Sequence, residues 1–278
     1  MNRPPVNQAE SPRLLMPMPD VQSAPDDRQL AIDHVGIRGL RYPLPVRDRD
    51  GVQTTIAQCA AYVALPADRK GTHMSRLVAL LEERAMPGAT PIAVDTLPAL
   101  LDALVQRLDA PSGRLELAFP FFVRKKAPVS GIASLLDYQV RLAGEVRQGV
   151  HAVTLAVAVP VTSLCPSSKE ISDYGAHNQR SEVTLSVRVR SPFFIADLVR
   201  VAEEEASAEL YGILKRADEK FVTERAYDNP RFVEDLVRGV AARLRDDPRV
   251  EAFAVEAENF ESIHNHSAYA MIESHPAP

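Results

Sequence analysis

The feature of this chain that most constrains its fold is an order of predicted elements that occurs twice. Runs in which apolar and polar residues alternate predict strands, and stretches with apolar residues every three or four positions predict helices. In the first half, the predicted strands are residues 31–44, 54–65, 113–125 and 137–148, and the predicted helices are 74–85 and 96–108. In the second half, the predicted strands are 151–161, 181–190, 250–262 and 267–274, and the predicted helices are 194–206 and 229–247. Both halves therefore follow the order strand–strand–helix–helix–strand–strand.

This repeated order indicates an α+β architecture, in which hairpins form antiparallel sheets and helices cover one face. A sheet with one uncovered face is often closed by association with further copies, so we expect an oligomer built around a barrel. We divide the chain into a first module, residues 29–148, and a second module, residues 149–278. Residues 1–28 contain six prolines and few large apolar residues, which predicts a flexible tail or an arm over a neighbouring subunit.

Two of the predicted helices carry capping signals at their starts. Thr96 is the predicted N-cap of the first-half helix that contains Pro98 in its first turn. Asn229 is the predicted N-cap of the last helix, with Pro230 at the first helical position.

The composition restricts the class of protein. The formal net charge is −5 and the isoelectric point is about 5.8, so the chain has no broad basic surface for a nucleic-acid backbone. Two cysteines, Cys59 and Cys165, do not make a disulfide framework and favour a reducing compartment. The N-terminal segment lacks the continuous apolar stretch of a signal peptide, and no apolar run is long enough to cross a bilayer. We expect a cytoplasmic protein without a membrane or nucleic-acid partner.

A polar insert, "TSLCPSSKEISDYGAHNQRSE" at residues 162–182, separates two predicted strands that a short turn could join. It contains Cys165 and His177, and thiolate and imidazole are both good ligands for Zn²⁺ or Fe²⁺. Their separation of twelve residues matches no common zinc-finger spacing, and a single cysteine is more often a small buried apolar side chain. A catalytic metal site would need a third ligand from elsewhere in the chain.

A second polar segment, residues 214–230, is densely charged and follows a predicted helix. The ordinary interpretation is a solvated loop. The functional interpretation is that Glu219 supplies the missing oxygen ligand and leaves one coordination position open for water.

The segment "NFESIHNHSAY", residues 259–269, contains two histidines two positions apart. If it is extended, His264 and His266 point to the same face, since strand side chains alternate with a period of two. They could be proton carriers, because imidazole titrates near neutral pH, and Glu261 could orient one of them. The alternative is a pair of solvent-facing histidines in a turn.

Basic residues gather in three places: residues 69–76, residues 124–126, and Lys169 with Arg180 inside the insert. Solubility explains any single one. Several lie near predicted helix starts, where anions bind well, so a converging set would suit a polyphosphate substrate. The sequence contains neither a phosphate-binding P-loop nor a dinucleotide-binding glycine motif nor the G-x-S-x-G turn of many hydrolases.

Five separated motifs in this chain resemble type IB GTP cyclohydrolase I. They are "AIDHVGIRGLRYPL", "KGTHMSR", "TSLCPSSKEISDYGAHNQRS", "LKRADEK" and "ENFESIHNHSAYA", and the resemblance runs from about residue 20 to residue 273. It implies a tunnelling fold (T-fold) with two tandem modules per chain, assembled into a homotetramer with active sites between subunits. It also implies conversion of GTP and water to 7,8-dihydroneopterin triphosphate and formate, the entry step of tetrahydrofolate synthesis. One divalent metal per site, Zn²⁺, Mn²⁺ or Fe²⁺, and no organic cofactor are expected.

The resemblance also implies residue roles. Cys165, at the catalytic centre, would bind the metal together with His177 and Glu219. Glu234 would hold the guanine ring through its N–H groups, and His264 and His266, with Glu261 behind them, would manage protons. The candidates for triphosphate contacts are Lys169, Arg180, His73 and Arg76. Many family members have "CPCSK" where this chain has "CPSSK", so Ser167 removes a second thiol from the motif.

Two other functions compete with this one. A T-fold nitrile reductase acting on a deazaguanine would use Cys165 as a nucleophile and a nicotinamide cofactor, and would have no use for His177 and Glu219 as ligands. A non-catalytic scaffold that binds purines or metal is the second alternative, although every residue that the reaction needs is present.

Overall fold

The computed structural model describes residues 20–275, and these form one continuous antiparallel sheet of nine strands. The order of strands across the sheet is β1-β2-β3-β4-β5-β6-β8-β9, and the short β7 pairs with β5. The strands are β1 (Ile32–Asp48), β2 (Gly51–Leu65), β3 (Ser112–Lys126), β4 (Ala133–Arg147), β5 (Val150–Leu164), β6 (Asn178–Val189), β7 (Ala208–Glu209), β8 (Val250–Asn259) and β9 (Ala268–Glu273). The eight strands expected from alternation are all present, and the antiparallel arrangement agrees with the predicted α+β class.

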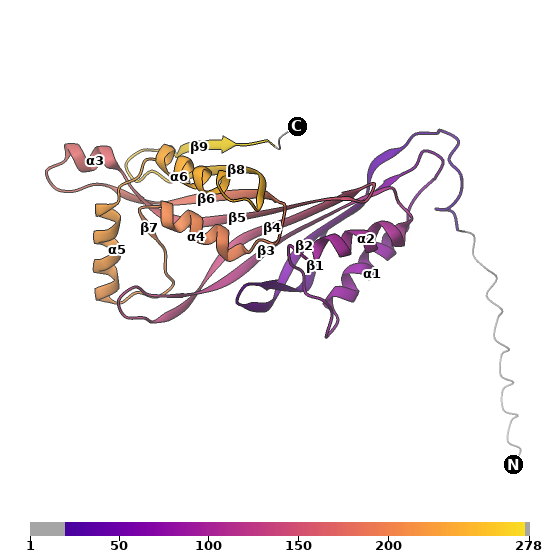
Figure 1. Ribbon diagram of the computed structural model, residues 1–278, viewed down its shortest axis with the longest axis horizontal. Coiled ribbons are helices and arrows are strands. Elements are labelled where there is room, and N and C mark those ends of the chain that lie inside the picture. The colour runs from indigo at the N-terminus through magenta and orange to yellow at the C-terminus, as the bar shows by residue number, and fades with distance from the viewer. Residues whose placement is uncertain (1–19, 276–278) are drawn as a thin grey trace, which may run out of the picture.

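The described residues contain six helices, and the third and fifth of them lie at one end of the sheet in Figure 1. They are α1 (Met74–Ala85), α2 (Leu97–Leu108), α3 (Pro166–Ile171), α4 (Ile195–Glu205), α5 (Arg216–Asp228) and α6 (Val233–Arg245). Helices α1 and α2 pack on first-half strands, and α4 and α6 pack on second-half strands. In Figure 1, α1 and α2 lie at the opposite end of the long axis from α3 and α5.

Of the two predicted N-caps, the position of Thr96 is confirmed and that of Asn229 is wrong. Thr96 directly precedes α2, but its hydroxyl bonds to Ala93 N (2.9 Å) and Pro91 O (2.9 Å) instead of a helix N–H. Asn229 does not begin the last helix. It ends α5, and its side chain donates to Ala206 O at 2.8 Å. The last helix begins at Val233, so the Asn-Pro pair terminates one helix rather than starting the next.

The charged segment interpreted as a loop is helix α5 in the structure. Its start is fixed by Asp218, whose carboxylate accepts from Lys215 N at 2.8 Å and from Val129 N and Ser130 N, both at 2.8 Å. Of the residues in α5, only Asp218 and Ala226 are buried. A helix with so little buried surface lacks the apolar stripe by which helices are recognised in a sequence.

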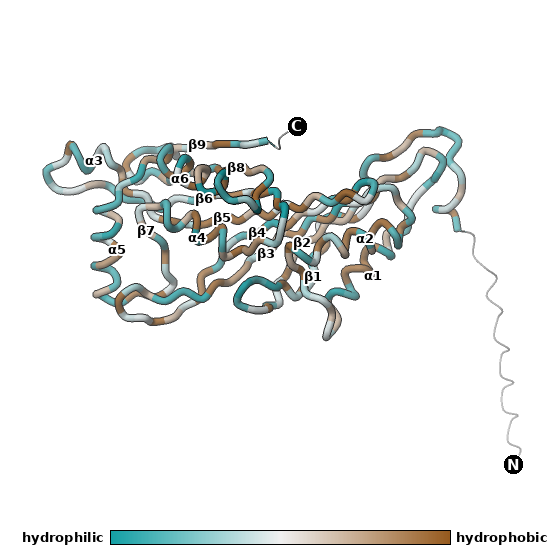
Figure 2. Tube along the Cα trace, viewed as in Figure 1, coloured by the Kyte–Doolittle hydropathy of each residue, from teal (hydrophilic) through white to brown (hydrophobic). Residues whose placement is uncertain are grey.

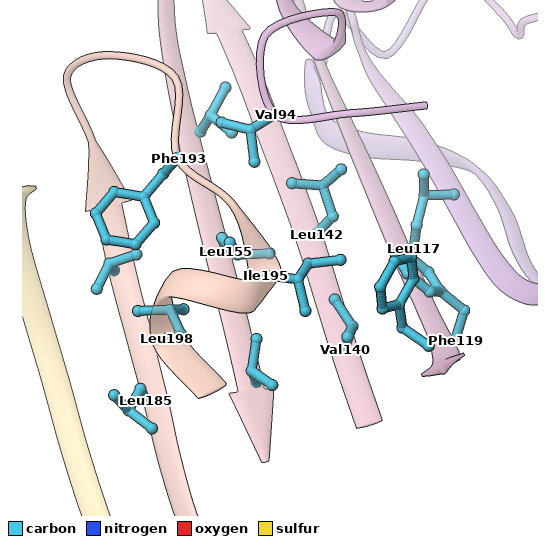
Figure 3. Packing of buried hydrophobic residues seen from close by; sticks show 14 of the residues in the cluster. Val94, Leu117, Phe119, Val140, Leu142, Leu155, Leu185, Phe193, Ile195 and Leu198 are labelled. Atoms are coloured by element: carbon cyan, nitrogen blue, oxygen red, sulfur yellow. The ribbon is translucent and has the colours of Figure 1, made fainter. Parts of the chain in front are cut away.

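One hydrophobic core spans both halves of the chain. Strand residues that face the helices are apolar and at most a few per cent exposed, and the brown segments of Figure 2 follow them along the sheet. Figure 3 shows Leu142 of β4 and Leu155 of β5 beside Ile195 at the start of α4. The predicted module boundary falls in the β4–β5 turn, where Gly149 has a φ of 77°. Since β4 and β5 pair along this boundary, the two halves share one sheet and one core.

The predicted N-terminal tail, residues 1–28, is described only from residue 20 onward, and residues 1–19 lie outside the described part. Residues 20–28 contact the chain's own segment before α1, where Lys70 N donates to Ala24 O and Gly71 N donates to Gln22 O, both at 3.0 Å. Over residues 20–275, no helix combines the length and the apolar character needed to cross a membrane.

Candidate metal and substrate site

A cleft of about 290 Å³ opens where the core-facing rows of three strands change from apolar to polar. The rows are Val159, Val161 and Ser163 along β5, followed by Cys165; Val183, Ser181 and Gln179 along β6, preceded by His177; and Val255, Ala257 and Asn259 along β8, followed by Glu261. The first turn of α6 and the loop after β8 complete the walls. A core position normally selects an apolar side chain, so polar residues on the same rows indicate a site.

Cys165 and His177 are neighbours because the β5–β6 ladder brings them opposite each other. The last strand pair is Leu164 with Asn178, and Cys165 N continues the ladder by donating to His177 O at 3.2 Å. Residues directly opposite in an antiparallel pair place their side chains on the same face, about 5 Å apart at Cβ. The Sγ of Cys165 accepts from Ser168 N at 3.4 Å, at the start of the short helix α3.

The imidazole of His177 is held from one side. Its Nδ1 lies 2.9 Å from Gln179 Oε1, 3.4 Å from Ser262 Oγ and 3.9 Å from Glu261 Oε2. The side chains of His177 and Glu261 are 13% and 12% exposed. Within residues 20–275, no protein group is hydrogen-bonded to Nε2 of His177, and both His177 and Cys165 line the cleft.

His264 and His266 lie together at the rim of the same cleft. Their rings stack with centroids 5.1 Å apart and planes at 19°. The prediction that strand alternation aligns them is wrong, because β8 ends at Asn259 and the two histidines lie in the loop before β9. Their proximity comes from ring stacking in an exposed loop, and Glu261 contacts His177 instead of either of them.

Glu234 enters the cleft from the first turn of α6, with an exposed carboxylate. Its neighbour Asp235 accepts from Phe232 N at 3.1 Å and caps the helix. Glu234 therefore has no capping role and lines the cleft. The aromatic ring of Phe232 lines the same wall.

Glu219 lies elsewhere in the single chain. It is exposed on the first turn of α5 and does not line the cleft. Among residues 20–275, no group of three His, Cys, Asp or Glu side chains is close enough to hold a metal ion. One chain thus brings together two of the three predicted ligands, Cys165 and His177.

Those two donors fit a transition-metal site. The Sγ of Cys165 and the Nε2 of His177, which has no hydrogen-bond partner in the described part of the chain, lie on the same face of one ladder at the mouth of a polar cleft. Zn²⁺ and Fe²⁺ accept this pair of ligand types.

Known proteins match the chain over nearly its whole length. Residues 18–270 match the family model "Type I GTP cyclohydrolase folE2". A GTP cyclohydrolase FolE2 from Paraburkholderia xenovorans is 59% identical over 257 residues, covering 92% of this chain and 94% of the relative. The enzyme of the same name from Cupriavidus necator is 57% identical over 256 residues, with coverage of 92% and 94%. The chain belongs to the type I GTP cyclohydrolase FolE2 family.

Solved structures show the same fold outside the FolE2 family. Uricase from Arthrobacter globiformis superposes with a TM-score of 0.50 at 11% identity, covering 87% of this chain and 92% of the uricase. This likeness supports the predicted T-fold architecture of sheet and helices and carries no further conclusion.

The basic residues assigned to triphosphate do not converge within one chain of this FolE2 protein. Lys169 of α3 donates to Tyr227 O and lies 4.3 Å from the centre of that ring, and Arg180 is exposed on β6. His73 contacts Asp20 at 3.1 Å, and Arg76 donates to Arg107 O at 3.4 Å.

His73 and Arg76 belong to the α1 region, at the far end of the molecule from α3 (Figure 1). Within one copy, His73 and Arg76 therefore do not lie beside Lys169.

Several residues of the cleft are not among those predicted from the sequence, including Gln179, Arg231, Phe232 and Asn259. Gln179 and Asn259 are 8% and 4% exposed, and the Oδ1 of Asn259 has no hydrogen-bond partner in the described part of the chain. Both occupy inward positions of strands whose other inward residues are mostly apolar. That break in alternation is the signal that could have found them.

A buried charged cluster fixes α5 against the sheet. Lys125 of β3 pairs with Glu203 of α4 at 2.6 Å and with Glu209 at 2.8 Å, and Arg225 of α5 lies 3.5 Å from Glu209. Tyr138 donates to Glu203 at 2.8 Å. Burial raises the pKa of both Tyr138 and Glu203 above their ordinary values. The helix that carries Glu219 is therefore attached to the core by polar contacts.

Proposed function

We propose that this chain hydrolyses GTP to 7,8-dihydroneopterin triphosphate and formate in a metal-dependent reaction of the type IB class. The chain is a GTP cyclohydrolase of folate biosynthesis by its family. The observation that carries the finer proposal is the convergence in one cleft of Cys165, His177, Glu234 and the stacked pair His264 and His266.

Cys165 and His177 would hold the metal, with Glu219 as the third ligand. A bound divalent cation lowers the pKa of a coordinated water from about 15.7 toward about 7, which supplies hydroxide at neutral pH. The ion can be Zn²⁺, Mn²⁺ or Fe²⁺, because the donor set accepts all three and availability in the cell decides among them.

Glu219 is best supplied by a second copy of the chain. Lys169, in the helix that follows Cys165, contacts Tyr227 near the C-terminal end of α5, whereas Glu219 lies eight residues earlier. Eight residues of α-helix span about 12 Å. The same reasoning applies to His73 and Arg76, so we propose a homotetramer whose sheets form a barrel and whose sites lie between subunits.

Activity in mixed tetramers tests this arrangement. Cys165→Ala and Glu219→Ala, each inactive alone, should regain activity when their subunits are mixed and reassembled. Mixed tetramers that form but stay inactive would place Glu219 in the same subunit as Cys165.

The remaining cleft residues would bind the purine and move protons. The Glu234 carboxylate accepts the N1–H and N2–H of guanine, an edge that presents two parallel donors. Addition of water at C8 opens the imidazole ring, and a second hydrolysis releases formate. Both steps and the later ribose rearrangement need proton transfers, for which His264 and His266 are placed at the rim. Lys169 and Arg180 would contact the triphosphate. We place the reaction in the cytoplasm.

The test uses full-length protein stripped of metal and incubated with GTP, with and without Mn²⁺, Zn²⁺ or Fe²⁺. Formate and a pterin that becomes fluorescent on oxidation should appear only in the metal-loaded samples. Absence of product with every metal would contradict the proposal, and NADPH-dependent reduction of a deazaguanine nitrile would identify the T-fold reductase instead.

A further inference from the structure

Gln179 occupies a position where the fold calls for an apolar side chain. It follows Val183 and Ser181 along the inward row of β6 and is 8% exposed. Burying an amide costs free energy unless its hydrogen bonds are made. The partner that the structure gives its oxygen is the Nδ1 of His177, at 2.9 Å.

The groups around this nitrogen determine which tautomer His177 adopts. An amide oxygen and an ionised carboxylate only accept hydrogen bonds, and both Gln179 Oε1 and Glu261 Oε2 face Nδ1. Glu261, 3.9 Å away, favours a proton on Nδ1 whichever way the Gln179 amide is turned. The neutral ring then carries its lone pair on Nε2, the nitrogen without a protein partner in residues 20–275.

We propose that Gln179 is a positioning residue for the metal ligand: its amide oxygen holds the proton of His177 on Nδ1 and fixes the ring so that Nε2 is the coordinating atom. Glu261 is the second acceptor on the same nitrogen, and this contact gives Glu261 a role different from orienting His264 or His266. The inference rests on the proposed function, which assigns His177 to the metal.

Without an acceptor for Nδ1, the neutral imidazole of His177 would distribute its proton between its two ring nitrogens and would rotate more freely. The fraction with the proton on Nε2 cannot bind metal through that atom. Loss of such outer partners typically weakens metal binding by about 10–100-fold.

The test compares two replacements of Gln179 in the full-length protein. Gln179→Met has a similar length but no strong acceptor, and Gln179→Glu keeps an acceptor oxygen. In competition with a chromophoric chelator, the Zn²⁺ dissociation constant of Gln179→Met should rise about 10–100-fold. That of Gln179→Glu should stay within about threefold of the parent, because the hydrogen bond to Nδ1 is retained.

Two controls separate this inference from the ligand assignment. Gln53→Met removes a glutamine whose amide bonds to the backbone of Phe122 in the first half of the sheet, and should leave Zn²⁺ affinity unchanged. His177→Ala should abolish specific Zn²⁺ binding. If His177→Ala loses the metal while Gln179→Met keeps the parental affinity, the role of Gln179 is refuted and the assignment of His177 as a metal ligand is retained. If His177→Ala keeps the metal, the ligand assignment and this inference both fail.

A second measurement does not depend on how the variants fold. Long-range proton–nitrogen NMR of metal-free protein with labelled histidine reports which ring nitrogen of His177 carries the proton. A protonated Nδ1 is expected, and a protonated Nε2 would overturn the proposal.

Discussion

The two halves of the molecule share an order of elements but differ in what their inward-facing residues do. In the first half, the rows of β2, β3 and β4 are apolar along most of their length and end in the buried polar residues Thr55, Lys125 and Ser134, and Cys59 lies fully buried among apolar side chains. In the second half, the equivalent rows become polar at one end, and Cys165 lies at the mouth of a cleft. The second half also contains two additions, α3 and the segment of β7 and α5.

The two cysteines illustrate this difference between the halves of the sheet. Burial raises the pKa of the Cys59 thiol to about 11, so Cys59 stays a neutral packing group at neutral pH. Cys165 is partly exposed and receives a hydrogen bond from Ser168 N. The candidate site lies where the inward rows of β5, β6 and β8 change from apolar to polar residues beside the first turn of α6.

The largest effect on activity is expected from substitution of Cys165, whereas substitution of Cys59 should leave the metal in place. Cys165→Ala, or His177→Ala, should remove the metal and lower formate release by about 10³-fold or more, since both the activated water and its electrostatic support are lost. Cys59→Ala should keep the metal and cost only about 1 kcal/mol of folding free energy for a small cavity. Metal analysis and GTP turnover measure both. Full metal content in Cys165→Ala would contradict the assignment of Cys165 as a metal ligand and of Cys59 as a packing residue.

The next effect concerns the stacked histidines. His264→Ala and His266→Ala should each reduce kcat by about 10²–10⁴-fold, the usual contribution of a general acid or base, while metal content stays unchanged. The control is His151→Ala, which removes an imidazole paired with Asp102 at 2.7 Å between β5 and α2. An unaltered kcat in both rim variants would assign the proton transfers to other groups.

A smaller effect distinguishes adjacent carboxylates on α6. Glu234→Ala should raise the KM for GTP by about 10–100-fold, because a bidentate contact to a base edge contributes about 1–3 kcal/mol. Asp235→Ala removes the cap on Phe232 N, so it should lower stability by about 1 kcal/mol and leave KM nearly unchanged. Steady-state kinetics and urea unfolding separate the two, and equal changes in KM would contradict the assignment.

The smallest effect is a pH-dependent change in folding stability on substitution of Asp218, the residue that fixes the start of α5. Burial alone would raise the pKa of Asp218, but hydrogen bonds from Ser130, Lys215 and Val129 outweigh it and hold the pKa well below its ordinary 3.8. The stabilisation is therefore fully present above pH 3.8 and is lost as pH falls toward the lowered pKa.

Asp218→Asn tests whether this stabilisation is lost as the pH falls. Its urea midpoint should lie below that of the parent at neutral pH, and the gap should shrink below pH 3.8. A gap that does not depend on pH would show that the charge of Asp218 has no part in holding the helix.

Much of the fold was predictable because alternation is a strong signal in long strands. The predicted helix at residues 74–85 coincides with α1, since Leu77, Leu80 and Leu81 form a clear buried stripe. Helix α5 was missed because few of its residues are buried: Asp218 and ion pairs hold it, and its apolar contacts are limited to a small cluster that includes Val222 and Ala226. Charged contacts with distant strands leave no periodic pattern in the sequence.

The site was only partly predictable for a related reason. Cys165 and His177 were found by residue type, but their contact depends on the register of β5 and β6, which the sequence does not state. The polarity of Gln179 was visible, whereas its bond to His177 depends on the rotamers of two buried side chains. Glu219, His73 and Arg76 lie outside the cleft of their own chain, so their predicted roles depend on assembly.

X-ray absorption at the metal edge tests the central claim most directly. In Zn²⁺-loaded protein, the account predicts one sulfur at about 2.3 Å, from Cys165, with nitrogen and oxygen ligands at about 2.0–2.2 Å. The sulfur contribution should persist in Cys59→Ala, which keeps the metal. A first shell of nitrogen and oxygen alone in the parent protein would contradict a metal site built on Cys165 and His177.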